Sequence, residues 1–458
     1  MASESFKSVS SADLLNLNTP SFIQVRDIKD LSSLPGRTAR ASSQVFQFLK
    51  EYCSSKTLKA NIQKACPWLQ QEQVEEIKNV FFALKNKSPR TDVYKLRKGT
   101  SHLDGKPTTL SYLIRENDFI VYTGLCVGSG HSKTVDKVIS VDEEGNINPL
   151  SHIKLHPEKR EIKYKALVEH EYHVRKQLDS DEVLSPGKIY AYTSKKGEKK
   201  FSWITPYYNR TASHVIKGKK GVGTAIFKEQ DAMPLNTLIL ALKMAESLKT
   251  MHDKGWLHRD IKLENYLVKY DEELFKIEQV AIADMAFSIQ EKDCSRIRKA
   301  IINDLVKVHL GKINSSLEAV FKRNPLLAQM SKDPDYPSVE SYKKAYEKAD
   351  SKDKDYQQVI TFLESLDSAL IVGTPNHIAP EIYTTRIYSK QADLYALGFS
   401  LMRLKEQLEV HALLKHTVDA SFDDLVMRLS HKDPHHRPDV NETITTLRKL
   451  IAIEMSAA

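Results

Sequence analysis

The stretch from about Thr91 to Leu155 reads as a series of strands, whereas most of the chain beyond Leu235 reads as helical. Runs such as FIVYTGLCV and TVDKVISV are rich in β-branched and aromatic residues, with turn signals such as LDGK and DEEGN between them. A helix-like run, IKYKALVEHEYHVRKQL, and the extended runs KIYAYT and KKFSWITPYY follow. This order predicts an α+β fold of two lobes, an antiparallel sheet followed by a mainly helical part, with a ligand between them.

The composition is consistent with a two-lobed globular protein. A chain of 458 residues favours two or three folding units, and 41% hydrophobic residues suffice for a sizeable core. No run approaches the roughly 20 apolar residues that cross a bilayer, so we expect no membrane span. The Lys and Arg residues behind the net charge of +9 are interleaved with Asp and Glu, which favours a solvated surface over a nucleic-acid site.

The four cysteines lie far apart, without metal-ligand spacing: Cys53, Cys66, Cys126 and Cys294. We expect reduced thiols and a cytoplasmic protein, with export into another cell left open. Residues 1 to about 40 are polar and predict a partly flexible lead-in. Residues 42–87 show helical periodicity, as in VEEIKNVFFALKNK, and predict a small helical extension of unknown role.

The segment WLHRDIKLENYLV carries the strongest chemical signal. It follows a predicted helix whose apolar stripe holds Leu238, Leu242, Ala245 and Leu248 and which ends near Gly255. In-line phosphoryl transfer needs a carboxylate for the attacking hydroxyl, a cation for the moving phosphate and an oxygen ligand for a metal. Asp260, Lys262 and Asn265 supply these three groups within six residues. A solvated polar turn is the alternative for this loop taken alone.

HRDIKLEN resembles the catalytic loop of eukaryotic-type protein kinases. Four further segments resemble that family's motifs in the family's order: VAIADMAFS, VGTPNHIAPE, SKQADLYALG and KDPHHRP. VAIADMAFS resembles the metal-binding Asp-Phe-Gly element and keeps its Asp as Asp284. VGTPNHIAPE resembles the end of an activation segment. The resemblance, which covers roughly Phe119 to Leu450, implies a structural Asp393 in a buried helix and an ion pair between Glu381 and Arg437.

The first lobe resembles the family less closely. LCVGSGHSKTV resembles the phosphate-covering glycine hairpin, with Lys133 in place of the third glycine. The resemblance implies nucleotide contacts for Gly128, Gly130 and Val135, a phosphate contact for Lys154, and a partner glutamate on the following helix, Glu171 or, as runner-up, Glu169. An exposed edge-strand lysine is the alternative for Lys154. WITPYY resembles the linker that receives adenine, which places Thr205 and Tyr207 at the nucleotide.

Two departures from the family stand out. Met285 and Ala286 replace the Phe and Gly that follow the metal-binding Asp, which implies either a hinge held near its active arrangement or harmless drift. The chain between Asp284 and Ala379 is far longer than an activation segment needs, so we expect a helical insertion at about 290–368 that gates the site, binds a partner or only decorates it. In the family, the Arg at position 259 often pairs with an activation-loop phosphate.

We therefore expect an N-terminal extension at 1–95, a kinase N-lobe at 96–205 and a kinase C-lobe at 206–455. The resemblance implies a serine/threonine protein kinase that uses ATP and Mg²⁺, acts on a protein substrate and binds no nucleic acid. Lys262 and Thr374 resemble the serine/threonine branch. A pseudokinase scaffold that binds nucleotide and partners without turnover is the alternative, and a kinase of small molecules is the third reading.

Overall fold

A computed structural model of the chain describes residues 25–27, 55–84, 92–100, 107–115, 118–129, 133–141, 146–155, 161–193, 199–217, 233–271, 274, 276–298, 300–301, 354–409 and 416–456. These residues form two compact units. The sheet unit comprises Ser10–Lys165 and Ser185–Tyr208, and the helical unit comprises Ala166–Leu184 and Asn209–Ala458, each over its described residues. The predicted N-lobe of residues 96–205 includes Ala166–Leu184, which belong to the helical unit.

The sheet unit is built on an eight-stranded sheet in the order β1-β2-β3-β4-β5-β6-β8-β7. Neighbouring strands from β2 onwards pair antiparallel, while β1 pairs parallel with β2. The strands are β1 (Val25–Asp27), β2 (Asp92–Thr100), β3 (Pro107–Arg115), β4 (Asp118–Ser129), β5 (Lys133–Val141), β6 (Ile147–Leu155), β7 (Lys188–Thr193) and β8 (Lys199–Pro206). Strands β2 to β8 confirm the antiparallel sheet predicted from the β-branched runs. The short strand β1 lies where a flexible lead-in was expected.

Two helices belong to this unit, α4 (Ser55–Ala65) and α5 (Gln71–Leu84); α4 packs on β6, and α5 packs on α4. Their buried side chains include Leu58 and Ile62 of α4 and Ile77 of α5. Lys137 of β5 joins sheet and helices, because its Nζ donates to the carbonyl of Ala65 over 3.3 Å. The helices predicted for residues 42–87 are thus confirmed from Ser55 onwards.

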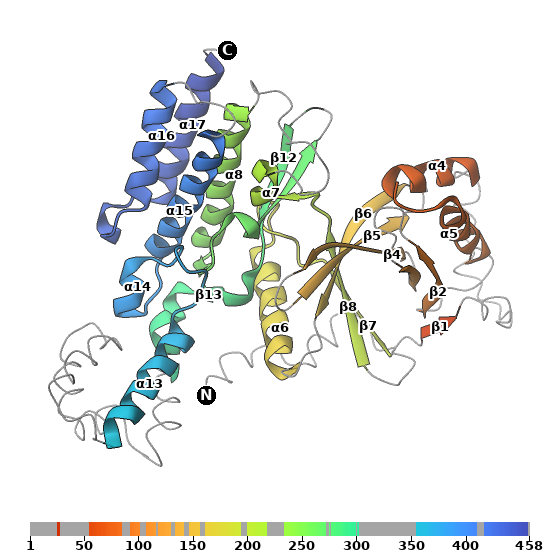
Figure 1. The fold of residues 1–458 in the computed structure, drawn as a ribbon, viewed down its shortest axis with the longest axis horizontal. Coiled ribbons are helices and arrows are strands. Elements are labelled where there is room, and N and C mark those ends of the chain that lie inside the picture. Colours follow the sequence, from red (N-terminus) through yellow and green to blue (C-terminus); the bar gives the residue numbers. More distant parts are fainter. Residues whose placement is uncertain are drawn as a thin grey trace. The chain divides into compact units, whose positions relative to one another are not determined.

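The helical unit contains α6 (Glu161–Leu178) from Ala166 onwards, α7 (Ala212–Lys217), α8 (Met233–Asp253), α13 (Lys354–Leu370), α14 (Pro380–Thr385), α15 (Lys390–Glu409), α16 (His416–Leu429) and α17 (Val440–Ser456). Figure 1 shows α8, α15, α16 and α17 side by side. Residues spaced three and four apart on α8, such as Leu238, Ala241, Ala245 and Leu248, are fully buried in the core of this unit.

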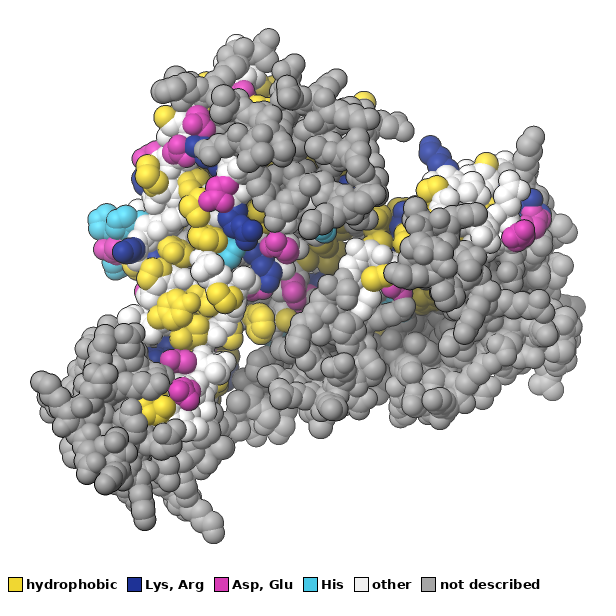
Figure 2. Space-filling model, viewed as in Figure 1, with side chains coloured by type: hydrophobic (Ala, Val, Ile, Leu, Met, Phe, Trp, Pro, Cys, Tyr) yellow, Lys and Arg dark blue, Asp and Glu magenta, His cyan; other side chains and the backbone are white. Residues whose placement is uncertain are grey.

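Short elements connect these helices. They are β9 (Arg210–Thr211), β10 (Trp256–Leu257), η3 (Leu263–Asn265), β11 (Tyr266–Asp271), β12 (Lys276–Ile282), η4 (Met285–Phe287), β13 (Ile289–Gln290), η5 (Glu291–Asp293) and η6 (Pro434–His436). Strands β11 and β12 form an antiparallel hairpin, and β9 pairs with β11. Figure 2 shows histidine side chains gathered at one edge of the unit, beside the connection from α16 to α17, which contains His431, His435 and His436.

The chain is an α+β protein with an antiparallel sheet and a helical part, as predicted. Within the predicted insertion, α13 is a helix, residues 294–298 are helical, and 302–353 lie outside the described residues. None of the helices in the described part of the chain is long and apolar enough to span a bilayer.

Candidate functional site

The loop from His258 to Asn265, here called the Asp260 loop, follows α8 and β10 and leads into β11. Gly255 ends the preceding helix with a φ of +73°, a left-handed conformation that favours glycine. On its far side the loop closes in the single turn η3, and Asn265 is the last residue before β11. Residues 258–265 are therefore held between a buried helix and a hairpin strand.

A buried aspartate of α15 fixes the backbone of this loop. The carboxylate of Asp393 accepts the backbone N–H of His258 over 2.8 Å and that of Arg259 over 2.9 Å, and lies 3.1 Å from Nε2 of His252. Burial alone would raise the pKa of Asp393, but these hydrogen bonds outweigh it and lower the pKa, so the carboxylate is charged. Asp393 is thus a buried structural residue, as the sequence predicted. The backbone of Arg259, which it binds, has a φ of +70°.

Asp260 lies at the centre of a small polar cluster. Its Oδ2 accepts Nζ of Lys262 over 2.7 Å, and its Oδ1 accepts the hydroxyl of Thr374 over 2.7 Å. Nζ of Lys262 also donates to Oγ1 of Thr374 over 2.9 Å, which closes a triangle of carboxylate, ammonium and hydroxyl. The contact of Thr374 with Asp260 was not predicted from the sequence, because the two residues lie 114 positions apart in the chain.

The charge state of Asp260 follows from these contacts. Burial alone would raise the pKa of its carboxyl, but hydrogen bonds from Lys262 and Thr374 outweigh burial and lower the pKa below its usual value. Asp260 is therefore ionised at neutral pH. A carboxylate that accepts a hydrogen bond from a hydroxyl can orient a hydroxyl nucleophile and receive its proton.

Two further oxygen-bearing side chains lie at the open end of the hairpin. Nδ2 of Asn265 donates to the backbone oxygen of Asp260 over 2.7 Å and to its Oδ2 over 3.1 Å, so the amide nitrogen is bound to Asp260. The carbonyl of Asn265 accepts the N–H of Ala283 over 2.8 Å, so Asp284, the next residue, begins beside Asn265. Asp284 adopts a left-handed conformation with a φ of +64°.

This pair suits a hard cation. Mg²⁺ takes one or two protein oxygens and completes its octahedron with phosphate oxygens and water. Asn265 and Asp284 offer one amide and one carboxylate, which fits that mode of binding. Over the described ranges, no group of three or more His, Cys, Asp and Glu is placed to hold a metal without other ligands.

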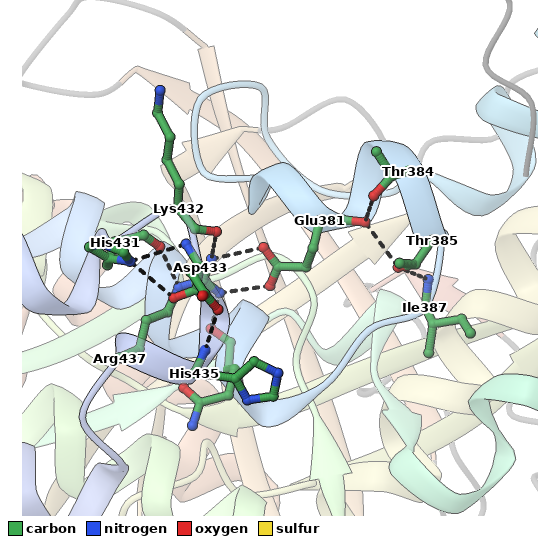
Figure 3. A network of polar contacts seen from close by, with 10 residues as sticks. Glu381, Thr384, Thr385, Ile387, His431, Lys432, Asp433, His435 and Arg437 are labelled. Carbon is green, nitrogen blue, oxygen red and sulfur yellow. Dashed lines mark hydrogen bonds and ion pairs between the residues drawn. The ribbon is translucent and has the colours of Figure 1, made fainter. Parts of the chain in front are cut away.

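The ion pair expected between Glu381 and Arg437 is present (Figure 3). Nη1 and Nη2 of Arg437 donate to the two carboxylate oxygens of Glu381 over 2.6 and 2.8 Å. The guanidinium also donates to the carbonyls of Gln391, His431 and Lys432. Because Arg437 is fully buried and its bonds reach three segments, it fixes α14 against α15 and the turn before α17.

The remaining predicted residues do not all come together. Val135 pairs with Ile153 and Thr205 with Ser151, so these positions share one face of the sheet. Lys154 is the next residue after Ile153 and pairs with Thr134, so its position belongs to the opposite face. A ligand against a single face of the sheet would not reach all three, and the side chain of Lys154 lies outside the described residues.

The other predicted nucleotide contacts lie around this sheet. Gly128 is exposed near the end of β4, with no atom within 4 Å of an added Cβ, while Gly130 lies outside the described residues. Tyr207 follows β8, and Nζ of Lys137 lies 4.7 Å from the ring centroids of both Tyr207 and Trp68. Lys137 lies on the same face of β5 as Val135, so the face that carries Val135 and Thr205 is the one covered by α4 and by Trp68 in the turn after it.

Glu171 is buried in α6 and forms an ion pair with Arg175 one turn later. Its neighbour His170 contacts the carbonyl of Ser288, with Nε2 2.7 Å from the oxygen. Burial is the main cause that lowers the pKa of His170. The ion pair of Glu171 with Lys154 stays a prediction, and Arg175 is a partner that the helical spacing of four residues could have indicated.

The sequence did not indicate the roles of Tyr388, whose hydroxyl binds the backbone of Val372, or of Arg386, which forms an ion pair with Asp367. A tyrosine or an arginine carries no local signal of a partner that lies 16 or 19 residues away in the chain.

No model of a known protein family matches the chain, and no curated protein is significantly similar to it.

Proposed function

We propose that this chain is a protein kinase that transfers the γ-phosphoryl group of ATP to serine and threonine hydroxyls of proteins. The observation that carries the proposal is the triangle of Asp260, Lys262 and Thr374. In it, an ionised carboxylate accepts a hydrogen bond from a hydroxyl over 2.7 Å, beside an ammonium group. The order of kinase-like motifs in the sequence supports the same reading.

Each residue has a defined task in this proposal. Asp260 orients the substrate hydroxyl and takes its proton as the hydroxyl oxygen bonds to the γ-phosphorus and the bond from phosphorus to the ADP oxygen breaks. Lys262 offsets the negative charge on the transferred group. The hydroxyl of Thr374 holds the side chains of Asp260 and Lys262 in place until the substrate hydroxyl takes its position at the carboxylate.

Asn265 and Asp284 would hold Mg²⁺, which supplies charge neutralisation at the phosphates when bound. Lys154, Gly128 and Gly130 are the proposed phosphate contacts of the sheet unit. Val135, Thr205 and Tyr207 carry less of the proposal, because Val135 and Thr205 belong to the face covered by α4 and Trp68, and the Tyr207 ring already contacts Lys137 on that face.

The test is phosphate transfer from ATP to a generic protein substrate by the purified full chain, read by mapping phosphoserine and phosphothreonine. We expect transfer with Mg²⁺, none after chelation, and loss of about 100-fold or more in the Asp284→Asn variant because a metal ligand is removed. ATP binding without transfer by the wild type would instead favour a nucleotide-binding scaffold. Phosphorylation of small molecules alone would refute the protein substrate.

A further inference from the structure

The residues from Ile371 to Thr374, here called the Thr374 segment, bring Thr374 to Asp260. The position of this segment matters because it places the hydroxyl of Thr374, which donates to the carboxylate of Asp260. A displacement of the segment by about 1 Å would break a 2.7 Å hydrogen bond and misplace the reacting groups. The contacts that hold this segment therefore bear on activity.

A single tyrosine hydroxyl binds both backbone groups of one residue in the segment. The N–H of Val372 donates to Oη of Tyr388 over 2.9 Å, and Oη of Tyr388 donates to the carbonyl of Val372. Tyr388 is 7% exposed, and burial raises the pKa of its phenol to about 12, so the hydroxyl keeps its proton at physiological pH. Tyr388 thus acts as a fixed two-point tether for Val372.

The same tyrosine also contacts the Asp260 loop. The guanidinium carbon of Arg259 lies 4.5 Å from the centroid of the Tyr388 ring, within the range of a cation–π contact. Arg259 directly precedes Asp260, and its backbone is fixed by Asp393. One side chain therefore connects the segment that carries Thr374 to the loop that carries Asp260.

A second anchor lies upstream of the segment. Asp367, in the last turn of α13, accepts Nε of Arg386 over 2.7 Å and Nη2 of Arg386 over 2.5 Å, and the side chain of Arg386 is fully buried. The N–H of Ile371 donates to the carbonyl of Asp367 over 2.8 Å, so the segment starts from this fixed turn. The helix expected at the end of an insertion thereby anchors the segment that follows it.

We propose, on the basis of the proposed kinase function, that Tyr388 is a positioning residue which, with the Asp367–Arg386 pair, fixes the Thr374 segment for catalysis without phosphorylation. Arg259 is then a stacking partner of Tyr388 and not a phosphate receptor. The Tyr388 ring covers one face of the guanidinium of Arg259, and in the part of the chain that the structure describes Nε of Arg259 has no hydrogen-bond partner.

The tether is tested with Tyr388→Phe, which removes only the hydroxyl, against Tyr383→Phe, which does the same at a tyrosine of α14 that is 46% exposed. For Tyr388→Phe we expect amide exchange of residues 371–379 to rise about 10-fold and kcat to fall about 10-fold, with the KM for ATP unchanged. Tyr383→Phe should match the wild type. Unchanged exchange and kcat in Tyr388→Phe would overturn the proposal.

The independence from phosphate is tested on the full wild-type chain, once after phosphatase treatment and once after incubation with Mg-ATP. We expect rates that agree within about two-fold. A rise of 10-fold or more that follows phosphorylation, and that is lost in Arg259→Ala, would show a phosphate receptor and overturn the proposal. If the wild type transfers no phosphate at all, the proposed function fails, whereas the exchange comparison still decides whether Tyr388 fixes the segment.

Discussion

The hydroxyl of Thr374 donates to the carboxylate of Asp260 over 2.7 Å, although 114 residues separate the two in the chain. This contact joins the loop after α8 to the segment before α14. It also shows that the carboxylate can accept a hydrogen bond from a hydroxyl group, and a substrate hydroxyl would make the same bond. The geometry around this pair leads to the following expectations.

Replacing Thr374 by alanine removes the hydroxyl that bridges Asp260 and Lys262. We expect kcat to fall about 10-fold, because one charge-assisted hydrogen bond contributes roughly 1.5 kcal/mol to the arrangement. The measurement is steady-state phosphate transfer at saturating ATP. Thr384→Ala serves as the control, since that exposed hydroxyl only donates to the carbonyl of Glu381, and equal losses in both variants would contradict a specific role for Thr374.

Gly373 has a φ of +117°, and a Cβ at this position would lie 2.6 Å from the carbonyl oxygen of Arg259. Gly373→Ala should therefore destabilise the protein by about 1–3 kcal/mol, the usual cost of a strained backbone at one position. It should also lower activity, since Thr374 is the next residue. Urea unfolding and transfer rates measure the two effects, and a variant as stable and active as the wild type would contradict the close approach of Gly373 to the backbone of Arg259.

Breaking the buried pair of Arg437 and Glu381 should cost about 3–5 kcal/mol, because Arg437→Met leaves a partly buried carboxylate and three carbonyls without their donor. The pair of Arg448 and Glu246 lies on the surface and gives a matched control, for which Arg448→Met should cost about 0–1 kcal/mol. Chemical denaturation of both variants provides the values. Equal costs would contradict a structural role for the pair of Arg437 and Glu381.

Burial, with a smaller contribution from the charge of Arg403, lowers the pKa of His377 below its value of roughly 6.5 in the unfolded chain. Below that pH the unfolded state binds a proton that the folded state does not, so stability is complete above about pH 6.5 and falls as the pH decreases towards the folded pKa. The loss for one histidine is at most about 1.4 kcal/mol per pH unit. His377→Gln should flatten this part of the stability curve, and an unchanged slope would assign the dependence to other groups such as His170.

The sequence was sufficient for elements whose pattern is local. Strands β2 to β8 follow β-branched runs bounded by turns, and α8 ends at Asp253, two residues before the glycine that predicts its end. Strand β1 has only three residues, Val25–Asp27, and so has no periodicity to detect. The pair of Glu381 and Arg437 could be expected only through the kinase resemblance, since no local rule joins residues 56 positions apart.

Contacts made by tertiary packing were beyond the sequence. The tether from Tyr388 to Val372 uses backbone groups, which carry no residue-specific signal. Register was equally hidden, because a shift of one residue exchanges the two faces of a strand. For this reason the sequence grouped Val135 with Lys154, while the pairing of β5 with β6 places these positions on opposite faces.

The most direct test compares phosphate transfer by Asp260→Asn with that by Asp253→Asn, which changes an exposed carboxylate at the end of α8. If Asp260 receives the proton of the substrate hydroxyl, its variant should lose about 100- to 10,000-fold in kcat while it binds Mg-ATP as the wild type does. The control variant should keep full activity. Transfer by Asp260→Asn at the rate of the wild type would contradict the role assigned to this carboxylate and, with it, the proposed function of the site.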